Sequence, residues 1–196
     1  AERERGVIAM SAGNHAQAIA HRATCMGVAS TIVMPRSTPN TKVANTERLG
    51  ATVVLHGEML TEARAEAQRR CDAGGLVWVP PYDDPLVIAG QGTCAVEMLA
   101  DAPGLDVLVV PCGGGGLLSG IAVAARSLQP GIEIVGVQVD RYAAMVSRIQ
   151  GLGAPTGGST IAEGIAVLEP GELTPPIVTE LVDELVVVDD GAIEVA

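Results

Sequence analysis

The sequence predicts an α/β protein built from two open parallel-sheet domains. Short runs rich in Val and Ile alternate with segments of helical periodicity, and Gly or Pro marks most of the boundaries. Aromatic residues make up only 2% of the chain and Phe is absent, which leaves aliphatic side chains and Ala to form the core. Such a core is typical of a parallel sheet covered by helices. A chain of 196 residues can form one large domain or two small ones.

The first part of the chain is expected to contain four strands separated by three helices. The strands are predicted at residues 7–10, 30–34, 52–55 and 76–79. The helices are predicted to begin near Asn14, at Asn40 or Thr41, and at Leu60, and to end at Gly27, Gly50 and Gly74-Gly75. A repeated strand-helix-strand order implies right-handed crossovers, and therefore a small parallel sheet.

A domain boundary is expected within residues 80–90. Pro80 and Pro81 stop both helix and sheet, and Asp83-Asp84-Pro85 continues the turn chemistry. The sequence therefore predicts a small domain over residues 6–83 and part of a larger domain over residues 84–196.

The alternation of strands and helices resumes in the second part. Helices are predicted at residues 92–101, 117–128 and 177–182, and strands at residues 106–110, 133–138 and 184–188. Residues 151–175 are rich in Gly, Pro and Thr, and are expected to form a long ordered loop. The first and the last residues of the sequence are each expected to be part of a helix that is incomplete.

Composition excludes several classes of function. A formal net charge of −11 argues against a nucleic-acid partner, because phosphate backbones are bound by basic surfaces. No segment has the apolar length of a membrane span, and the first residues do not form a signal peptide. The four Cys show neither zinc spacing nor a disulfide framework, which favours a cytoplasmic location. Cys112 has no basic partner nearby in the sequence, and is interpreted as a core residue rather than as a nucleophile.

Four consecutive glycines form the most specific feature of the sequence. They lie between a predicted strand and a predicted helix, and comprise Gly113, Gly114, Gly115 and Gly116. Each glycine costs backbone entropy on folding and adds no side chain to the core, so a ligand pressed against bare backbone is the favoured reason for the run. A helix N-terminus offers unpaired N–H groups to a phosphate. The run lacks the lysine of a Walker loop and the spaced glycines of a dinucleotide fingerprint. A flexible linker is the less favoured alternative.

Two further loops could contact a ligand. Residues 11–17 follow the first strand, and offer an open helix N-terminus for a carboxylate together with the side chain of Asn14. Ser11 or Asn14 could instead cap that helix, and the two roles are compatible. In the second loop, residues 160–164, Glu163 is a candidate polar contact, although a surface carboxylate is the ordinary expectation.

Four motifs follow one another along the chain: residues 11–17 (SAGNHAQ), 87–93 (VIAGQGT), 111–117 (PCGGGGL) and 160–167 (TIAEGIAV). In this order, they resemble the pyridoxal-phosphate threonine dehydratases and their serine dehydratase and serine racemase relatives. The resemblance runs from about Gly6 to the end of the chain. It implies the tryptophan-synthase-β-like fold, known as fold type II, with an incomplete larger domain.

The resemblance also implies a cofactor, pyridoxal 5′-phosphate, and the residues that bind it. The cofactor phosphate would be held by Gly113, Gly114, Gly115, Gly116 and Leu117, and the ring would be approached by Asn14 and Gly164. The substrate would be bound by Ser11, Ala12, Gly13, His15 and Glu163, the first four through their backbone amides. For His15, orienting the loop and simple packing are both open.

Some positions depart from the family pattern. Ala12 stands where serine racemases carry a serine that acts as an acid/base, which favours elimination over racemisation. Gln138 and Ala144 stand where relatives with a structural divalent cation carry acidic ligands, so no metal site is expected. Tyr82 lies where threonine dehydratases tend to carry an aromatic residue. The Schiff-base lysine of the family has no counterpart, since Lys42, the one lysine, matches a different position and is interpreted as a solvated or capping side chain.

By resemblance, the intact enzyme deaminates L-threonine or L-serine to 2-oxobutanoate or pyruvate and ammonia by β-elimination of water. The chain by itself is expected to be inactive, because the lysine is absent. The alternatives are an inert cofactor-binding or regulatory module and, second, a serine racemase. The expected partners are a small amino-acid substrate and further copies of the chain, with no nucleic acid or membrane.

Overall fold

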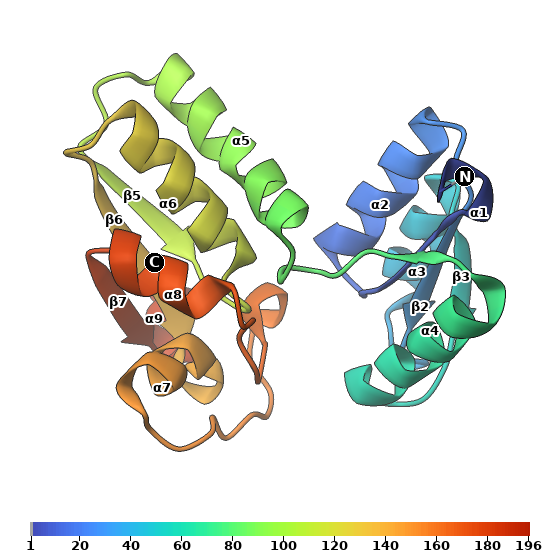
Figure 1. Ribbon diagram of the computed structural model, residues 1–196. Coiled ribbons are helices and arrows are strands. Elements are labelled where there is room, and N and C mark those ends of the chain that lie inside the picture. Colours follow the sequence, from blue (N-terminus) through green and yellow to red (C-terminus); the bar gives the residue numbers. More distant parts are fainter. Residues whose placement is uncertain (1) are drawn as a thin grey trace. The chain divides into compact units, whose positions relative to one another are not determined.

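The computed structural model describes residues 2–196 and divides into two compact units (Figure 1). The first unit ends at Pro81, and the second begins at Tyr82. By their contacts, Tyr82 and Asp83 therefore group with the second unit, whereas the sequence placed them in the small domain. The exact domain limits stay a prediction, and each unit is described separately below.

The first unit contains a four-stranded parallel sheet with the order β3-β2-β1-β4. Its strands are β1 (Val7–Met10), β2 (Ser30–Met34), β3 (Thr52–Leu55) and β4 (Val77–Trp78). Its helices are α1 (Glu2–Arg5), α2 (Asn14–Cys25), α3 (Asn40–Arg48) and α4 (Leu60–Gly74). The register aligns Val7 of β1 with Ser30 of β2 and with Val77 of β4. The predicted small parallel sheet is thus confirmed.

Helices cover both faces of this sheet. Ala16 and Ala20 of α2 pack with Ile32 and Met34 on one face, and α3 adds Val43 there. On the other face, Ala63 and Ala67 of α4 pack on residues of β1 and β2. Small alanines let the helices approach the sheet closely, which explains how a core with almost no aromatic residues fills its space.

One expected cap in this unit is wrong. Helix α3 begins at Asn40 and follows Pro39, and neither Asn40 nor Thr41 caps it with a side chain. The expected glycine ends are confirmed, since Gly27, Gly50 and Gly75 all adopt the positive φ angles that terminate helices.

The second unit contains a three-stranded parallel sheet with the order β5-β6-β7. Its strands are β5 (Val107–Pro111), β6 (Glu133–Val139) and β7 (Glu184–Val188). Its α-helices are α5 (Pro85–Asp101), α6 (Gly116–Leu128), α7 (Ala144–Gln150), α8 (Thr174–Leu181) and α9 (Asp190–Val195). Two 3-10 helices, η1 (Asp140–Tyr142) and η2 (Glu163–Ile165), lie in the connections.

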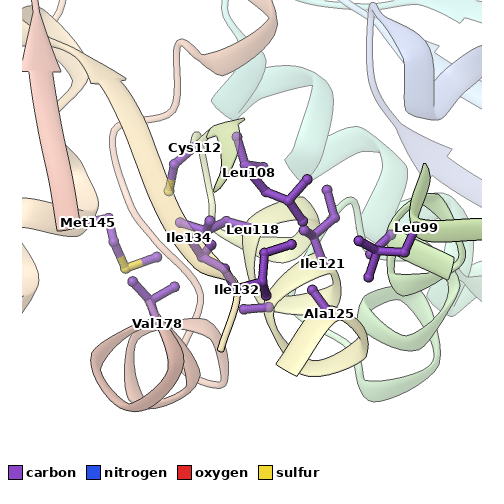
Figure 2. Packing of buried hydrophobic residues seen from close by; sticks show 13 residues of the cluster. Leu99, Leu108, Cys112, Leu118, Ile121, Ala125, Ile132, Ile134, Met145 and Val178 are labelled. Atoms are coloured by element: carbon purple, nitrogen blue, oxygen red, sulfur yellow. The ribbon is translucent and has the colours of Figure 1, made fainter. Parts of the chain in front are cut away.

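The core of this unit lies between the sheet and helices α5, α6 and α8. Figure 2 shows Leu118 and Ile121 of α6 packed against Ile134 of the sheet, with Leu99 of α5 on one side and Val178 of α8 on the other. Side chains of β5 alternate, so that Leu108 and Val110 enter this core while the other face of the strand is exposed. The core therefore fixes the carboxyl end of β5, from which the glycine run follows.

Three predictions for the second part need correction. Helix α5 begins at Pro85 rather than at Gly92, because the Asp84 carboxylate accepts hydrogen bonds from the amides of Leu86 and Val87. Helix α7 was not foreseen. Helix α8 begins at Thr174 rather than at Ile177, which shortens the long loop at its end. Along the described residues, no helix combines the length and apolarity that crossing a bilayer requires.

Candidate phosphate and carboxylate sites

The glycine run connects β5 to the N-terminus of α6 in the second unit. Gly114, Gly115 and Gly116 are buried, and within residues 2–196 no protein acceptor meets the N–H groups of Gly113 to Leu118. Buried N–H groups in proteins almost always have an acceptor. Six consecutive amides at the positive end of a helix therefore fit an anion of phosphate size.

The conformation of the run depends on glycine for two reasons. Gly115 has a φ angle of +95°, which residues with a side chain rarely adopt. Protein groups also lie against the run: a Cβ on Gly114 would stand 2.5 Å from the ring of Tyr82, and one on Gly113 would stand 3.0 Å from Val167. The sequence interpretation attributed the glycines to a ligand. The structure adds that their own neighbours already exclude side chains.

The segment that follows Glu163 lies next to the glycine run. Besides Val167, the Cα of Ile165 lies 3.2 Å from the position of a Cβ on Gly113. Just before Glu163, the loop is fixed by Thr160, whose hydroxyl donates to the Asp190 carboxylate at 2.6 Å. Glu163 and Gly164 themselves are exposed in η2. Two of the three candidate loops are thus adjacent within the second unit.

The loop of residues 11–17 belongs to the first unit and precedes α2. The amide of Gly13 donates to the Ser11 hydroxyl at 3.1 Å, so Ser11 stabilises the turn and does not cap the helix. Asn14 begins the helix and does not cap it, and its side chain is exposed. Across the described residues, the amides of Ala12, Asn14, His15 and Ala16 have no protein acceptor. These amides are available to a carboxylate at the helix N-terminus.

His15 connects this loop to the end of β4. Its Nε2 lies 3.2 Å from the carbonyl oxygen of Val79, which requires the tautomer with the proton on Nε2. Burial lowers the pKa of His15, and this effect outweighs the hydrogen bond to Val79. A neutral imidazole at pH 7 can therefore orient the loop while adding no charge beside it.

Cys112 and Gln138 lie beneath the glycine run. Burial raises the pKa of the Cys112 thiol to about 12, so it stays protonated and belongs to the core. The fully buried amide of Gln138 donates to the carbonyl oxygens of Cys112 and Tyr142, at 3.1 and 3.3 Å, and accepts from the amide of Val146 at 3.0 Å. Where relatives were expected to place an acidic cation ligand, this chain thus has a neutral side chain with its hydrogen bonds made.

Sequence reasoning missed Thr174, which bonds to the glycine run, and the role of Asp83, which fixes the residues just before Thr174. The hydroxyl of Thr174 donates to the carbonyl oxygen of Gly114, and the carboxylate of Asp83 accepts from the amides of Glu172 and Leu173. Both pairs join residues far apart in the sequence, so no local signal could reveal them. The position of Thr174 before Pro175 did offer a sign of a helix start.

Comparisons with known proteins agree on one family. A family model described as "Pyridoxal-phosphate dependent enzyme" matches residues 1–196. The L-threonine ammonia-lyase of Thermotoga maritima is 46% identical over 194 residues, which are 98% of this chain and 48% of that protein. The chain thus spans about half the length of this curated relative.

Solved structures give the same result. The processed form of threonine deaminase isoform 2 from Solanum lycopersicum has a TM-score of 0.89 at 37% identity, covering 96% of this chain and 52% of that one. Maize serine racemase has a TM-score of 0.91 at 35% identity, covering 98% of this chain and 59% of that one.

Proposed function

The chain belongs to the pyridoxal-phosphate-dependent enzyme family and has its fold-type-II α/β architecture, and on this premise we propose that the whole protein is a threonine/serine dehydratase. It would convert L-threonine or L-serine to 2-oxobutanoate or pyruvate and ammonia by β-elimination of water. The observation that carries the proposal is the row of buried and half-buried amides from Gly113 to Leu118, which lack any acceptor within the described residues. The name of the Thermotoga maritima relative supports the choice of substrate.

The glycine run would hold the phosphate of the cofactor. The N–H groups of Gly113, Gly114, Gly115, Gly116 and Leu117 would donate to it at the N-terminus of α6. The amide side chain of Asn14 would donate to the ring oxygen, and Gly164 would approach the ring. When bound, pyridoxal phosphate supplies a ring that stabilises negative charge on the substrate carbon.

The loop before α2 would bind the carboxylate of the substrate. The amides around Ser11, Ala12, Gly13 and His15 would donate to it, favoured by the dipole of α2. The neutral ring of His15, held on the Val79 carbonyl, would keep the first turn of α2 in place. Glu163 would contact the substrate from the other loop.

Ala12 favours elimination over racemisation. Its methyl group can neither donate nor accept a proton, so this position offers no acid or base for the opposite face of the substrate carbon. A D-serine product would contradict this part of the proposal. The inert binding module remains the alternative that a complete lack of turnover would favour. We further propose a cytoplasmic homo-oligomer as the working form.

The test uses the full-length protein that contains this sequence, supplied with pyridoxal phosphate. L-threonine and L-serine should each yield a 2-oxo acid, followed through NADH oxidation by a coupled 2-hydroxy-acid dehydrogenase. Asn14→Ala should lower kcat/KM about tenfold, the effect of one lost hydrogen bond. Asn45→Ala is the matched control: it lies on α3 in the same unit, and its side chain accepts from Arg48. Equal effects of the two substitutions would contradict the role of Asn14, and no 2-oxo acid from either substrate would exclude the proposed function.

A further inference from the structure

The carbonyl oxygen of Gly114 is held from the protein side of the glycine run. It accepts from the hydroxyl of Thr174 at 2.7 Å and from the amide of Gly171 at 3.2 Å. Thr174 is fully buried, and its own carbonyl lies 3.5 Å from the hydroxyl of Ser119 on α6. The hydroxyl of Thr174 therefore bonds inside the protein, on the side of the loop away from any ligand of its amides.

Peptide geometry turns this contact into a constraint on the amide of Gly115. The carbonyl of Gly114 and the N–H of Gly115 belong to one trans peptide, in which the two groups point in opposite directions. Fixing the carbonyl toward Thr174 directs the N–H away from it. Since Gly114 and Gly115 both lack a side chain, the backbone itself limits the rotation of this peptide less than in other residues.

We propose that Thr174 is a positioning residue that aims the amide of Gly115 at the phosphate of the cofactor. This inference deepens the proposed function and rests on it. Thr174 never touches the phosphate, so its effect reaches the ligand only through the Gly114–Gly115 peptide.

Thr174 is itself held by the start of α8. The two oxygens of Asp83 accept from the amides of Glu172 and Leu173, each at 2.9 Å, immediately before Thr174. Pro175 fixes the next backbone angle. The hydroxyl is thus presented by a constrained backbone, which is what a residue that orients another group requires.

A purely structural role is the rival explanation. The hydrogen bond from Thr174 also satisfies the buried carbonyl of Gly114. Loss of any such bond to a buried carbonyl lowers the stability of the fold, whether or not a ligand site is nearby. The two roles differ in one measurable way. Only a positioning role predicts a loss of affinity that depends on the phosphate of the ligand.

The test compares Thr174→Ser with Thr174→Ala in the full-length protein. Both variants lack the methyl group and differ in the hydroxyl alone, so their comparison holds packing constant. Dissociation constants for pyridoxal phosphate and for pyridoxal are measured on the apo protein by isothermal titration calorimetry. Thr174→Ala should bind pyridoxal phosphate about tenfold more weakly than Thr174→Ser, while their affinities for pyridoxal should agree within about twofold.

Thr179→Ala provides the matched control. Thr179 lies on the same helix, and its hydroxyl donates to the carbonyl of Pro175 at 2.8 Å, away from the glycine run. It should leave both affinities unchanged. If Thr174→Ala does not fold, Thr174→Val, which keeps the side-chain volume and lacks the hydroxyl, is compared with the unsubstituted protein instead.

The inference is overturned if the serine and alanine variants bind pyridoxal phosphate equally, or if both ligands lose affinity to the same extent. It is also overturned if Thr179→Ala shows the same loss as Thr174→Ala. Failure of the proposed function has a different signature, because the unsubstituted protein would then bind pyridoxal phosphate no more tightly than pyridoxal.

Discussion

At the scale of single residues, His15 makes the stability of the folded protein depend on pH. Its pKa in the folded protein lies below the ordinary 6.5, mainly because burial disfavours the charged ring. As the pH falls through about 6.5, His15 therefore becomes protonated in the unfolded chain while it stays neutral in the folded protein. The contribution of His15 to stability is complete above that pH, and is lost as the pH falls toward the folded-state pKa.

An NMR titration can check this directly. The ring resonance of His15 should titrate below pH 6.5, the ordinary value for a histidine in an unstructured peptide, which serves as the reference. A midpoint for His15 at or above that of a histidine in an unstructured peptide would refute the burial argument. The pKa values of Glu66, at about 2, and of Asp183 are also lowered, but these carboxyl groups change stability only at more acidic pH. They therefore do not overlap with the pH range in which His15 changes stability.

Gln138 allows a second prediction, because every polar group of its buried side chain has a partner. Gln138→Glu removes both donated hydrogen bonds and places a carboxylate beside the carbonyl oxygens of Cys112 and Tyr142. We expect the free energy of unfolding at pH 7 to fall by about 3 kcal/mol or more, as for other uncompensated buried charges. Protonating the new carboxyl group should recover part of this loss in mildly acidic buffer.

The control for Gln138 is the same substitution at Gln129. The amide of Gln129 donates a single hydrogen bond, to the carbonyl of Leu105 at 2.7 Å, from a half-buried position. Gln129→Glu should therefore cost clearly less in urea unfolding curves. Equal losses at the two positions would show that burial of Gln138 is not the cause.

At the scale of elements, helices α5 and α6 approach each other where Gly92 meets Gly120. A Cβ on Gly120 would clash with the carbonyl oxygen of Ile88 and lie 2.7 Å from the amide nitrogen of Gly92. Because both obstacles are backbone atoms, they cannot rotate aside. Gly120→Ala should force the helices apart and destabilise the second unit by about 1–3 kcal/mol, seen as a lower melting temperature in calorimetry.

Gly90 provides the contrast within α5. No atom lies within 4 Å of the position that its Cβ would occupy, so Gly90→Ala should be neutral or stabilise the helix by up to about 1 kcal/mol. A loss of stability at Gly90 as large as that at Gly120 would argue against the close approach. The two glycines of the motif at residues 87–93 thus differ in role. Gly92 is needed for the packing of α5 on α6, whereas no neighbour of Gly90 excludes a side chain there.

The same elements show what sequence alone could and could not predict. Strands such as Thr52–Leu55 were predictable because each is a short apolar run bounded by glycine, proline or a polar turn. The start of α5 was not predictable, because Asp84-Pro85 is equally typical of a turn and of an N-cap followed by the first residue of a helix. The role of Thr174 could not be predicted from the sequence, because its partner Gly114 lies 60 residues away along the chain.

At the scale of the whole molecule, one face of the sheet in the second unit lacks the cover that the other face has. Val109 of β5 is 67% exposed and Val107 is 42% exposed on that face, whereas Leu108 and Val110 are buried under helices. Parallel sheets are normally covered on both faces, and an apolar strand at a sheet edge favours association.

We therefore expect a polypeptide of these 196 residues to self-associate through this face. Sedimentation velocity should show an average mass that rises with concentration, and Val109→Lys should suppress the rise by placing a charge on the face. Val123→Lys is the matched control, since Val123 is 44% exposed and belongs to helix α6 and not to the sheet. If Val109→Lys leaves association unchanged, or if Val123→Lys suppresses it equally, the exposed valines are not the surface responsible, and the apolar contact must be sought on another element.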